Sequence, residues 1–356
     1  MIAIAAALLL QASEPAVDAQ RLVDRGAPGA VVMVLDHGEP VISVAGVRAT
    51  GEEAAIELTD LWHLGSNTKA MTAVLIARLV EQGVVEWDDT VEDWLGDRVE
   101  TIRPDYADAT FADLMHHRSG IIANPGPITS LQLMGTDDSR DVMADRLRYA
   151  AAVLDHDPGA APGEFLYSNA GYTVAGTMLE AATGESWEAL LVREVFTPLG
   201  IEHAGFGPPG SADSIDQPRG HRGGMFGGLN AVAPGARADN PPAMGPAGRV
   251  HMAMQDYALW LDAVMAGARG EGDPDFLSPE SWDILLTPPE GGNYAMGWGV
   301  TDEGTVLSHA GSNTMWFVQA VLWPEADRAA VAGVNDGRLD RLSPHVGEVV
   351  LGYAPE

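Results

Sequence analysis

Leu64-Gly-Ser-Asn-Thr-Lys-Ala-Met-Thr72 is the stretch from which the fold and the chemistry of this chain can be worked out. Ser66 and Lys69 are three residues apart, so a helix that begins here brings the serine hydroxyl and the lysine amine to one face. A serine hydroxyl is a weak nucleophile until a neighbouring base takes its proton, and a lysine shielded from water is such a base. The spacing therefore predicts an activated nucleophile at the start of a helix.

Lys69 is also the only lysine in the chain, in which lysine and arginine together number 20. Arginine cannot replace it as a base, because a guanidinium group does not lose its proton in a protein. The alternative is that the lysine falls three residues after a serine by chance. A Ser-x-x-Lys spacing alone does not decide between the two, and the other motifs of the chain have to do so.

The chain has 356 residues and a net charge of −31, so it can bury a large core and presents a strongly acidic surface. Such a surface repels nucleic-acid phosphates and anionic lipid headgroups, and we expect neither as a partner. The absence of cysteine excludes disulfides, thiolate metal sites and cysteine nucleophiles. The expected partner is a small-molecule or peptide substrate, and the sequence leaves the oligomeric state open.

Residues 2–10 form a short apolar run, and Val17-Asp-Ala19 follows as a candidate cleavage site of a secretory signal. On this interpretation residues 1–19 are a signal peptide, and the protein is periplasmic or secreted. The positive charges that usually precede such a run are missing, so an N-terminal helix of a cytoplasmic protein is the alternative. The run is too short to cross a bilayer, and we expect no stable membrane insertion.

Apolar and β-branched runs typical of strands occur at both ends of the chain. Residues 30–35 and 40–44 flank a turn and predict a hairpin, and further strand patterns lie at 294–300, 305–308, 315–323 and 329–334. We therefore predict an α+β fold, in which helices flank an antiparallel sheet built from about 20–60 and 290–356. A mostly helical region, about 61–289, is inserted between the two parts of the sheet, and residues 20–356 form one domain.

Helical spacing predicts helices that begin near Ser66 and at 110, 142, 174, 251, 279 and 339. Residues 205–248 are rich in glycine and proline without periodicity, which for so long a segment indicates a lid or a substrate-binding wall. The acidic pairs in 84–100 are typical of a solvated helix face rather than a cation site. His116 and His117 are adjacent and point in different directions in a helix, so we expect no metal site.

Three motifs stand in order along the chain: Ser66-Asn-Thr-Lys69, Tyr167-Ser-Asn169, and His309-Ala-Gly311 followed by Ser312. Together they resemble the penicillin-recognising serine hydrolase superfamily, and within it class C β-lactamases, D-alanyl-D-alanine peptidases, D-aminopeptidases and β-lactamase-like esterases. The resemblance covers about residues 22–352 in the family's order. It extends to three supporting stretches, Leu114-Met-His-His-Arg-Ser-Gly120, Pro198-Leu-Gly200 and Pro246-Ala-Gly248.

The resemblance implies a role for each matching residue. Ser66 would be the nucleophile that becomes acylated, Lys69 its proton partner, and Tyr167 the group that passes a proton to the leaving group and later activates water. Asn169 would hold the substrate carbonyl or the lysine amine. The backbone N–H groups of Ser66 and Ser312 would form an oxyanion hole. No metal or organic cofactor is implied.

His309, Gly311 and Ser312 would lie on the strand beside the substrate. β-Lactamases of this type usually present Lys-Thr-Gly there, and His309-Ala-Gly311 looks more like the esterase and peptidase relatives. A neutral imidazole attracts an anionic substrate less than lysine does. We therefore predict a serine hydrolase that acts through an acyl-enzyme on an ester, amide or D-amino-acid peptide. A β-lactamase or penicillin-binding carboxypeptidase is the first alternative, and a non-catalytic binding protein on the same fold is the second.

Overall fold

The computed structural model describes residues 14–126, 141–224, 228–301 and 304–355. The helices within these ranges are α1 (Pro15–Asp24), α2 (Thr68–Glu81), α3 (Val91–Leu95), α4 (Pro104–Ala107), α5 (Phe111–Met115), α7 (Val142–Leu154), α8 (Asn169–Thr183), α9 (Trp187–Leu191), α10 (Gly245–Gly248), α11 (Met254–Ala268), α12 (Pro279–Leu286) and α13 (Leu339–Leu351). The strands are β1 (Gly29–Asp36), β2 (Glu39–Gly46), β3 (Leu61–His63), β4 (Ala204–Phe206), β5 (Gly220–Gly223), β6 (Leu229–Val232), β7 (Val250–Ala253), β8 (Gly299–Val300), β9 (Leu307–Ser312), β10 (Phe317–Trp323) and β11 (Arg328–Val334). Short 3₁₀ turns lie at Gly65–Asn67, Pro242–Met244 and Pro324–Ala326.

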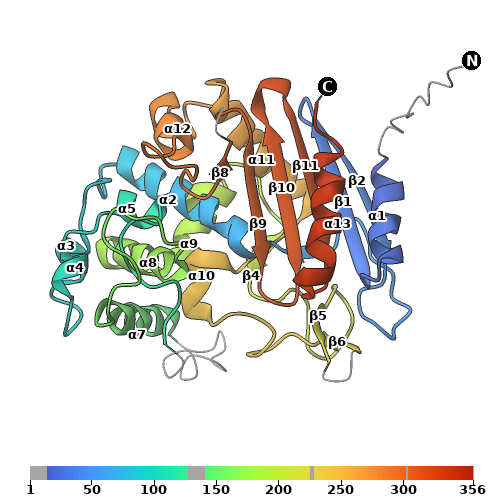
Figure 1. Ribbon diagram of the computed structural model, residues 1–356, viewed down its shortest axis with the longest axis horizontal. Helices are drawn as coiled ribbons and strands as arrows, with labels where there is room; N and C mark the ends of the chain where they lie inside the picture. The colour runs from blue at the N-terminus through green and yellow to red at the C-terminus, as the bar shows by residue number, and fades with distance from the viewer. Residues whose placement is uncertain (1–13, 127–140, 225–227, 302–303, 356) are drawn as a thin grey trace, which may run out of the picture.

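The main sheet is antiparallel, with the strand order β2-β1-β11-β10-β9-β8. Strand β1 from the start of the chain pairs with β11 from its end, so that Ala30 lies opposite Val334. The two ends of the chain therefore share one sheet, and the helical region lies beside it (Figure 1). The predicted α+β fold with a sheet assembled from both ends is confirmed, and the extent of the domain stays a prediction.

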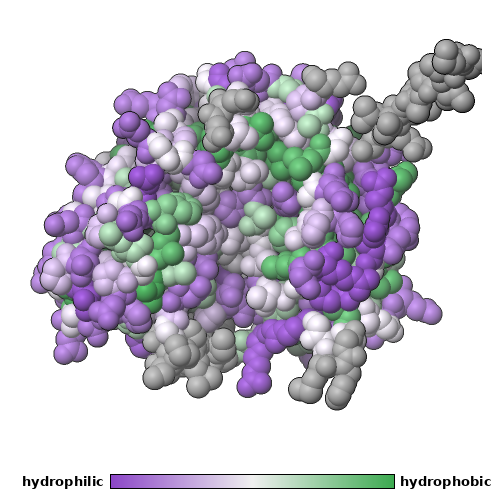
Figure 2. All heavy atoms as spheres, in the orientation of Figure 1, coloured by the Kyte–Doolittle hydropathy of each residue, from purple (hydrophilic) through white to green (hydrophobic). Residues whose placement is uncertain are grey.

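Each face of the sheet has its own hydrophobic core, because successive side chains of a strand point to opposite faces. In β1, Val31 and Met33 pack in the large core shared with the helical region. Ala30 and Val32 pack in the second core, to which α1 and α13 contribute Leu22 and other apolar residues. Figure 1 shows α1 and α13 against that face of the sheet. On the outside of the molecule, Figure 2 shows hydrophilic residues over most of the visible surface.

Helix α2 lies in the middle of the helical region and is buried on nearly every side. Helices α8 and α10 pack together beside it, and this contact needs a glycine. A Cβ atom on Gly176 of α8 would lie 2.3 Å from Cγ of Pro246 in α10. The close approach brings the start of α8 and the backbone of α10 next to the first turn of α2.

Three secondary-structure predictions need correction. Val250–Ala253 is strand β7, not the start of a helix, because it pairs with β3 and β4. The segment 205–248 contains the β5–β6 hairpin and helix α10, so it is not devoid of regular structure. Only Gly299–Val300 of the pattern at 294–300 forms a ladder with β9. The partners of β7, strands β3 and β4, are distant in sequence and leave no local signal, whereas β5–β6 and β8–β9 each join segments that are close in the chain.

The predicted signal segment lies mostly in residues 1–13, outside the described residues. Its candidate cleavage site lies within α1, where Asp18 and Ala19 are buried. The hydroxyl of Tyr353 donates a 2.7 Å hydrogen bond to Asp18 Oδ2 and ties this helix to the end of the chain. The signal peptide and the location of the protein stay predictions. In the described part of the chain, no helix combines the length and apolar character that crossing a membrane requires.

Candidate active site

Ser66 lies in the tight turn Gly65–Asn67 that leads into α2. The turn is held against the main sheet, since Asn67 Nδ2 donates to the carbonyl oxygens of Leu64 (2.8 Å) and Val318 (3.2 Å). Gly65 has φ 52°, a conformation that favours glycine, and a Cβ there would lie 2.4 Å from the backbone nitrogen of Ser312. The turn and strand β9 are therefore in direct backbone contact.

Lys69 is fully buried, and its amine contacts three oxygen atoms. Nζ lies 3.2 Å from Ser66 Oγ, 2.7 Å from Asn169 Oδ1 and 2.6 Å from the carbonyl oxygen of Ala247. The amide of Asn169 is oriented by its Nδ2, which donates to Asn124 Oδ1 at 3.0 Å. Burial lowers the pKa of Lys69 well below its ordinary value.

Three oxygen neighbours can serve either an ammonium or a neutral amine, and the lowered pKa favours the neutral amine. A neutral amine has two N–H donors and one lone pair, whereas an ammonium has three donors and none. The oxygens of Asn169 and Ala247 can only accept, so they take the two N–H groups. The lone pair is then left for the third neighbour, Ser66, whose hydroxyl can donate to it.

The ring of Tyr167 also lies beside the amine of Lys69. Lys69 Nζ is 4.8 Å from the centre of its ring. Burial raises the pKa of Tyr167 to about 12, although a hydrogen bond with Ser66 opposes the shift. At neutral pH the residue is therefore a phenol that can donate a proton, with Ser66 as its hydrogen-bonding neighbour.

Two histidines and a second tyrosine enclose Tyr167. The ring of His117 packs on it with centres 4.4 Å apart, and His117 Nδ1 accepts a hydrogen bond from the backbone N–H of Ser168. His309 on β9 pairs through Nε2 with the hydroxyl of Tyr294 at 3.1 Å. Burial lowers the pKa of His309 to about 3, so its imidazole is neutral.

Strand β9 approaches Ser66 so closely that a side chain at Gly311 is excluded. A Cβ there would lie 2.0 Å from the carbonyl oxygen of Leu64 and 2.7 Å from the backbone nitrogen of Ser66. This close approach brings the backbone nitrogens of Ser66 and Ser312 near each other. The structure assembles every residue of the predicted site, and the roles assigned to these residues stay predictions.

A buried carboxylate, Asp239, connects the two backbone segments that meet at Ser66. It accepts hydrogen bonds from His63 Nε2 (2.8 Å), Arg249 Nε (3.2 Å) and Asn313 Nδ2 (2.9 Å). His63 Nδ1 accepts from the backbone N–H of Gly65 at 3.2 Å, and Asn313 directly follows Ser312. Burial opposes ionisation of Asp239, but His63 and Arg249 lower its pKa below the ordinary value. The carboxylate thus acts as a charged brace behind the site.

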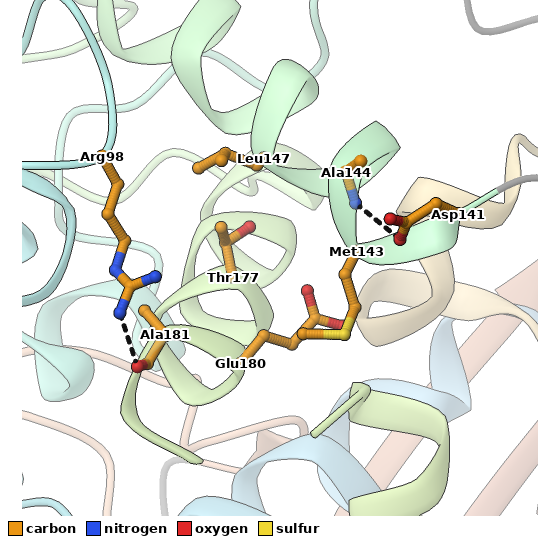
Figure 3. Close-up of a pocket in the computed structure, with 8 residues that line it drawn as sticks. All are labelled: Arg98, Asp141, Met143, Ala144, Leu147, Thr177, Glu180 and Ala181. Atoms are coloured by element: carbon orange, nitrogen blue, oxygen red, sulfur yellow. Dashed lines mark hydrogen bonds between the residues drawn. The ribbon is translucent and has the colours of Figure 1, made fainter. Parts of the chain in front are cut away.

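Two cavities of the described structure differ in what they adjoin. A cavity of about 240 Å³ lies between α7 and α8, and Arg98 in its wall donates to the carbonyl oxygen of Ala181 (Figure 3). No candidate nucleophile of the predicted site lines it. A larger cavity of about 510 Å³ adjoins the end of β9 and is lined by Arg222, Ala236, Arg237, Asp239, Asn240, Pro241, Asn313, Thr314 and Met315. Ser66 lines neither cavity, but Asn313 in the wall of the second one directly follows Ser312.

Among the described residues, no three histidine or acidic side chains cluster closely enough to hold a metal ion. His117 has φ 59° and turns into the tyrosine cluster, where burial lowers its pKa well below the ordinary value.

A sequence profile of the family described as Beta-lactamase matches residues 15–344 of this chain. The chain belongs to the Beta-lactamase family. This match confirms the resemblance carried by the three motifs. It places the chain among penicillin-recognising serine hydrolases in sequence as well as in fold.

Two curated proteins match parts of the chain. It is 30% identical over 190 residues to Unguisins hydrolase ungD of Aspergillus violaceofuscus, which covers 49% of this chain and 31% of that protein. It is 29% identical over 178 residues to Penicillin-binding protein 4 of Amycolatopsis lactamdurans, which covers 50% of this chain and 44% of that protein. The matched part of the chain thus spans less than half of either relative.

A solved structure gives the same fold over nearly the whole chain. The D-stereospecific amidohydrolase from Streptomyces superposes with a TM-score of 0.72 at 22% identity, and covers 94% of this chain and 98% of that one. At this identity the likeness concerns the fold alone. The sequence relatives of the chain include a hydrolase, which supports a hydrolase as the coarse description of this protein.

Several residues of the site escape the sequence argument. Tyr294 and His63 stand outside every motif, and no spacing distinguishes them from ordinary residues of strands. Asp239 lies within the segment without periodicity. Ala247 lies in Pro246-Ala-Gly248, which resembles a family landmark, but the use of its carbonyl oxygen is visible only in the structure.

Proposed function

We propose that this protein is a serine hydrolase that cleaves an ester, amide or D-amino-acid peptide through an acyl-enzyme at Ser66. The observation that carries the proposal is the environment of Lys69. Its two N–H groups have fixed acceptors, its charge is disfavoured by burial, and its remaining neighbour is the hydroxyl of Ser66. An activated serine needs a base of this kind.

In the first step, Ser66 Oγ bonds to the carbonyl carbon of the substrate while its proton moves to the amine of Lys69. The negative charge that develops on the carbonyl oxygen is stabilised by the N–H groups of Ser66 and Ser312. The bond to the leaving group then breaks, and the leaving group takes a proton from the hydroxyl of Tyr167. Lys69 returns its proton to Tyr167, so the pair is neutral again.

In the second step, water attacks the acyl carbon and the bond to Ser66 breaks. The water proton passes through Tyr167 and Lys69 to Ser66 Oγ, which regenerates the starting state. Asn169 holds the lysine amine during both steps, because its Oδ1 is fixed by Asn124. His309 lines the site as a neutral imidazole, and its hydrogen bond with Tyr294 holds the ring in place.

The test is covalent labelling with a fluorophosphonate, read by intact mass. We expect a single adduct on the native protein, no adduct on Ser66→Ala, and labelling of Lys69→Arg slower by at least about a hundredfold. Circular dichroism of each variant checks that it is folded. A folded native protein without an adduct would favour the non-catalytic binding protein.

Substrate panels then separate the enzymatic alternatives. The names of the relatives, a hydrolase of unguisins, a penicillin-binding protein and a D-stereospecific amidohydrolase, support testing amides and D-amino-acid derivatives beside esters and β-lactams. We rank β-lactams lower, because His309 stands where lysine usually attracts their carboxylate. Rapid hydrolysis of a penicillin, and slow hydrolysis of esters and D-amides, would reverse this ranking.

The apolar run at residues 2–10 supports export, and we propose a periplasmic or secreted location for this protein. The proposed partner is a small-molecule or peptide substrate. Cell fractionation and N-terminal sequencing of the native protein test the location; recovery of the intact chain from the cytoplasm contradicts it.

A further inference from the structure

Two arginines, Arg222 and Arg237, line the cavity at the end of β9. They are positive groups in a protein whose net charge is −31. Arg222 comes from β5 and Arg237 from the segment that leads to α10. Among the described residues, neither guanidinium is found in an ion pair with a carboxylate. The one carboxylate in the cavity wall, Asp239, is already bound by Arg249, His63 and Asn313. The cavity therefore has local positive charge available for a ligand.

Both arginines are exposed, and Arg222 is held by contacts of its own side chain and of the residue before it. Arg222 donates through Nη2 to the carbonyl oxygen of Arg237 (3.3 Å) and contacts the sulfur of Met315 (3.5 Å). The preceding residue, His221, is buried. The backbone N–H of His221 donates to the carbonyl oxygen of Met315 at 3.0 Å. Strand β5 is thus attached to the segment that follows β9. The position of Arg222 relative to the site is set by this attachment.

The direction of β9 fixes which part of a substrate reaches the arginines. His309, Tyr294 and Tyr167 lie towards the start of the strand, and Ser66 faces its later part at Gly311 and Ser312. Thr314 and the cavity come after that, no more than about 7 Å beyond Ser312 along the chain. Tyr167 is the proposed proton donor to the leaving group, so the cavity lies on the opposite, acyl side.

We propose that this cavity is an acyl-side subsite for a carboxylate, which selects substrates whose acyl group carries a negative charge a few bonds from the scissile carbonyl. The inference rests on the proposed serine-hydrolase function and names its substrate class. It refines the expectation from net charge, because the local pair of arginines opposes the acidic field of the whole molecule inside a concave site. Guanidinium groups suit carboxylates in particular, since they form two parallel hydrogen bonds.

The test uses two esters that differ in one charge: mono-p-nitrophenyl adipate, with a free carboxylate, and its methyl ester. In both, Ser66 Oγ bonds to the acyl carbon and p-nitrophenolate leaves, so release of the same chromophore is measured. We expect the native protein to prefer the carboxylate by about tenfold in kcat/KM, mainly through KM. The preference should fall as salt rises from low to about 0.5 M.

The matching variants are Arg222→Gln, Arg237→Gln and the double variant, and Arg25→Gln, at the C-cap of α1, is a control of equal charge change for each single variant. The double variant should lose the preference while its rate on the methyl ester stays within about twofold of native. Arg25→Gln should keep the preference. An unchanged preference in the double variant, or no preference in the native protein, overturns the proposal.

If the proposed function fails, rather than the subsite, neither ester is hydrolysed and Ser66 takes no fluorophosphonate adduct. The subsite is then measured by equilibrium binding of monomethyl adipate and dimethyl adipate to Ser66→Ala protein. Tighter binding of the anion, lost in the double arginine variant, supports the subsite even without turnover; equal binding of the two compounds rejects it.

Discussion

Lys69 shows how much a single residue depends on what surrounds it. An exposed lysine is an ammonium with no lone pair, and it cannot act as a base at neutral pH. Here burial lowers its pKa, and the oxygens of Asn169 and Ala247 hold the amine in position. These contacts come from α8 and α10, so the residue acquires its chemistry from elements far along the chain.

The pKa of Lys69 can be measured directly, because the chain has no other lysine. Protein grown with lysine labelled with ¹³C at the ε carbon should show one side-chain signal from lysine. We expect its titration midpoint to lie well below 10.5, and the rate of Ser66 labelling to rise with pH through the same midpoint as the amine becomes neutral. Tyr167, with a pKa of about 12, should add no second inflection below pH 10. A lysine midpoint at or above 10 contradicts the neutral amine.

Tyr167→Phe isolates the hydroxyl of the proposed proton donor. The ring and its packing on His117 remain, so we expect the free energy of unfolding to change by less than about 1 kcal/mol. Turnover should fall by about 10² to 10³. Tyr294→Phe is the matched control, since it removes a hydroxyl that bonds to His309 rather than to Ser66, and it should cost less than about tenfold. Equal losses in the two variants would contradict a particular role of the Tyr167 hydroxyl as proton donor.

At the scale of elements, the site depends on how closely strand β9 approaches the turn before α2. Gly311 and Gly65 leave no room for a side chain between the two backbones. The brace of His63, Asp239 and Asn313 connects the same two segments from behind. Together these contacts set the distance between the backbone nitrogens of Ser66 and Ser312.

Gly311→Ala tests this approach. The added methyl group would meet the carbonyl oxygen of Leu64 at 2.0 Å, so β9 has to move away. We expect a loss of about 2 to 4 kcal/mol in the free energy of unfolding in urea, and a larger proportional loss of Ser66 labelling. Gly299→Ala on the neighbouring strand β8 is the control, because its methyl group would meet Ser308 at no less than 3.3 Å. Native-like labelling by a stable Gly311→Ala protein would argue against an oxyanion hole at this place.

At the scale of the whole molecule, the net charge is −31, and many hydrophilic residues lie on the face that Figure 2 shows. Repulsion among the excess carboxylates opposes the compact state. Salt weakens this repulsion, because the Debye length falls from about 30 Å at 0.01 M to about 8 Å at 0.15 M. The structure tolerates this charge because two apolar cores, one on each face of the main sheet, are kept free of it.

We therefore expect the free energy of unfolding at pH 7 to rise as NaCl is increased from 0.01 to about 0.5 M. Near pH 5, closer to the isoelectric point of about 4.4, the same increase in salt should have a smaller effect, because part of the carboxylates are protonated. Denaturant unfolding at each salt concentration provides the measurement. A stability that is flat or falls with salt at pH 7 would show that charge repulsion is not a significant cost in this fold.

The sequence by itself determined the strands at the two ends of the chain, helices such as α7 and α12, and the pairing of Ser66 with Lys69. Each of these is encoded in spacing within one short segment, through the periods of the strand and the helix. The three motifs in order also determined the family. Strand β7 was not determined in this way, because its pairing partners β3 and β4 lie elsewhere in the chain, and the hairpin β5–β6 was missed although its two strands are close in sequence.

Only the tertiary structure decided the properties of the site. The acceptors of Lys69 lie 100 and 178 positions from it, and the brace through Asp239 joins residues 176 and 74 positions apart. Nothing in the sequence distinguishes Arg222 and Arg237 from the other arginines of the chain; only the structure places them in one cavity. Removal from water and hydrogen bonds between distant segments set pKa values and geometry, and neither is a function of local sequence.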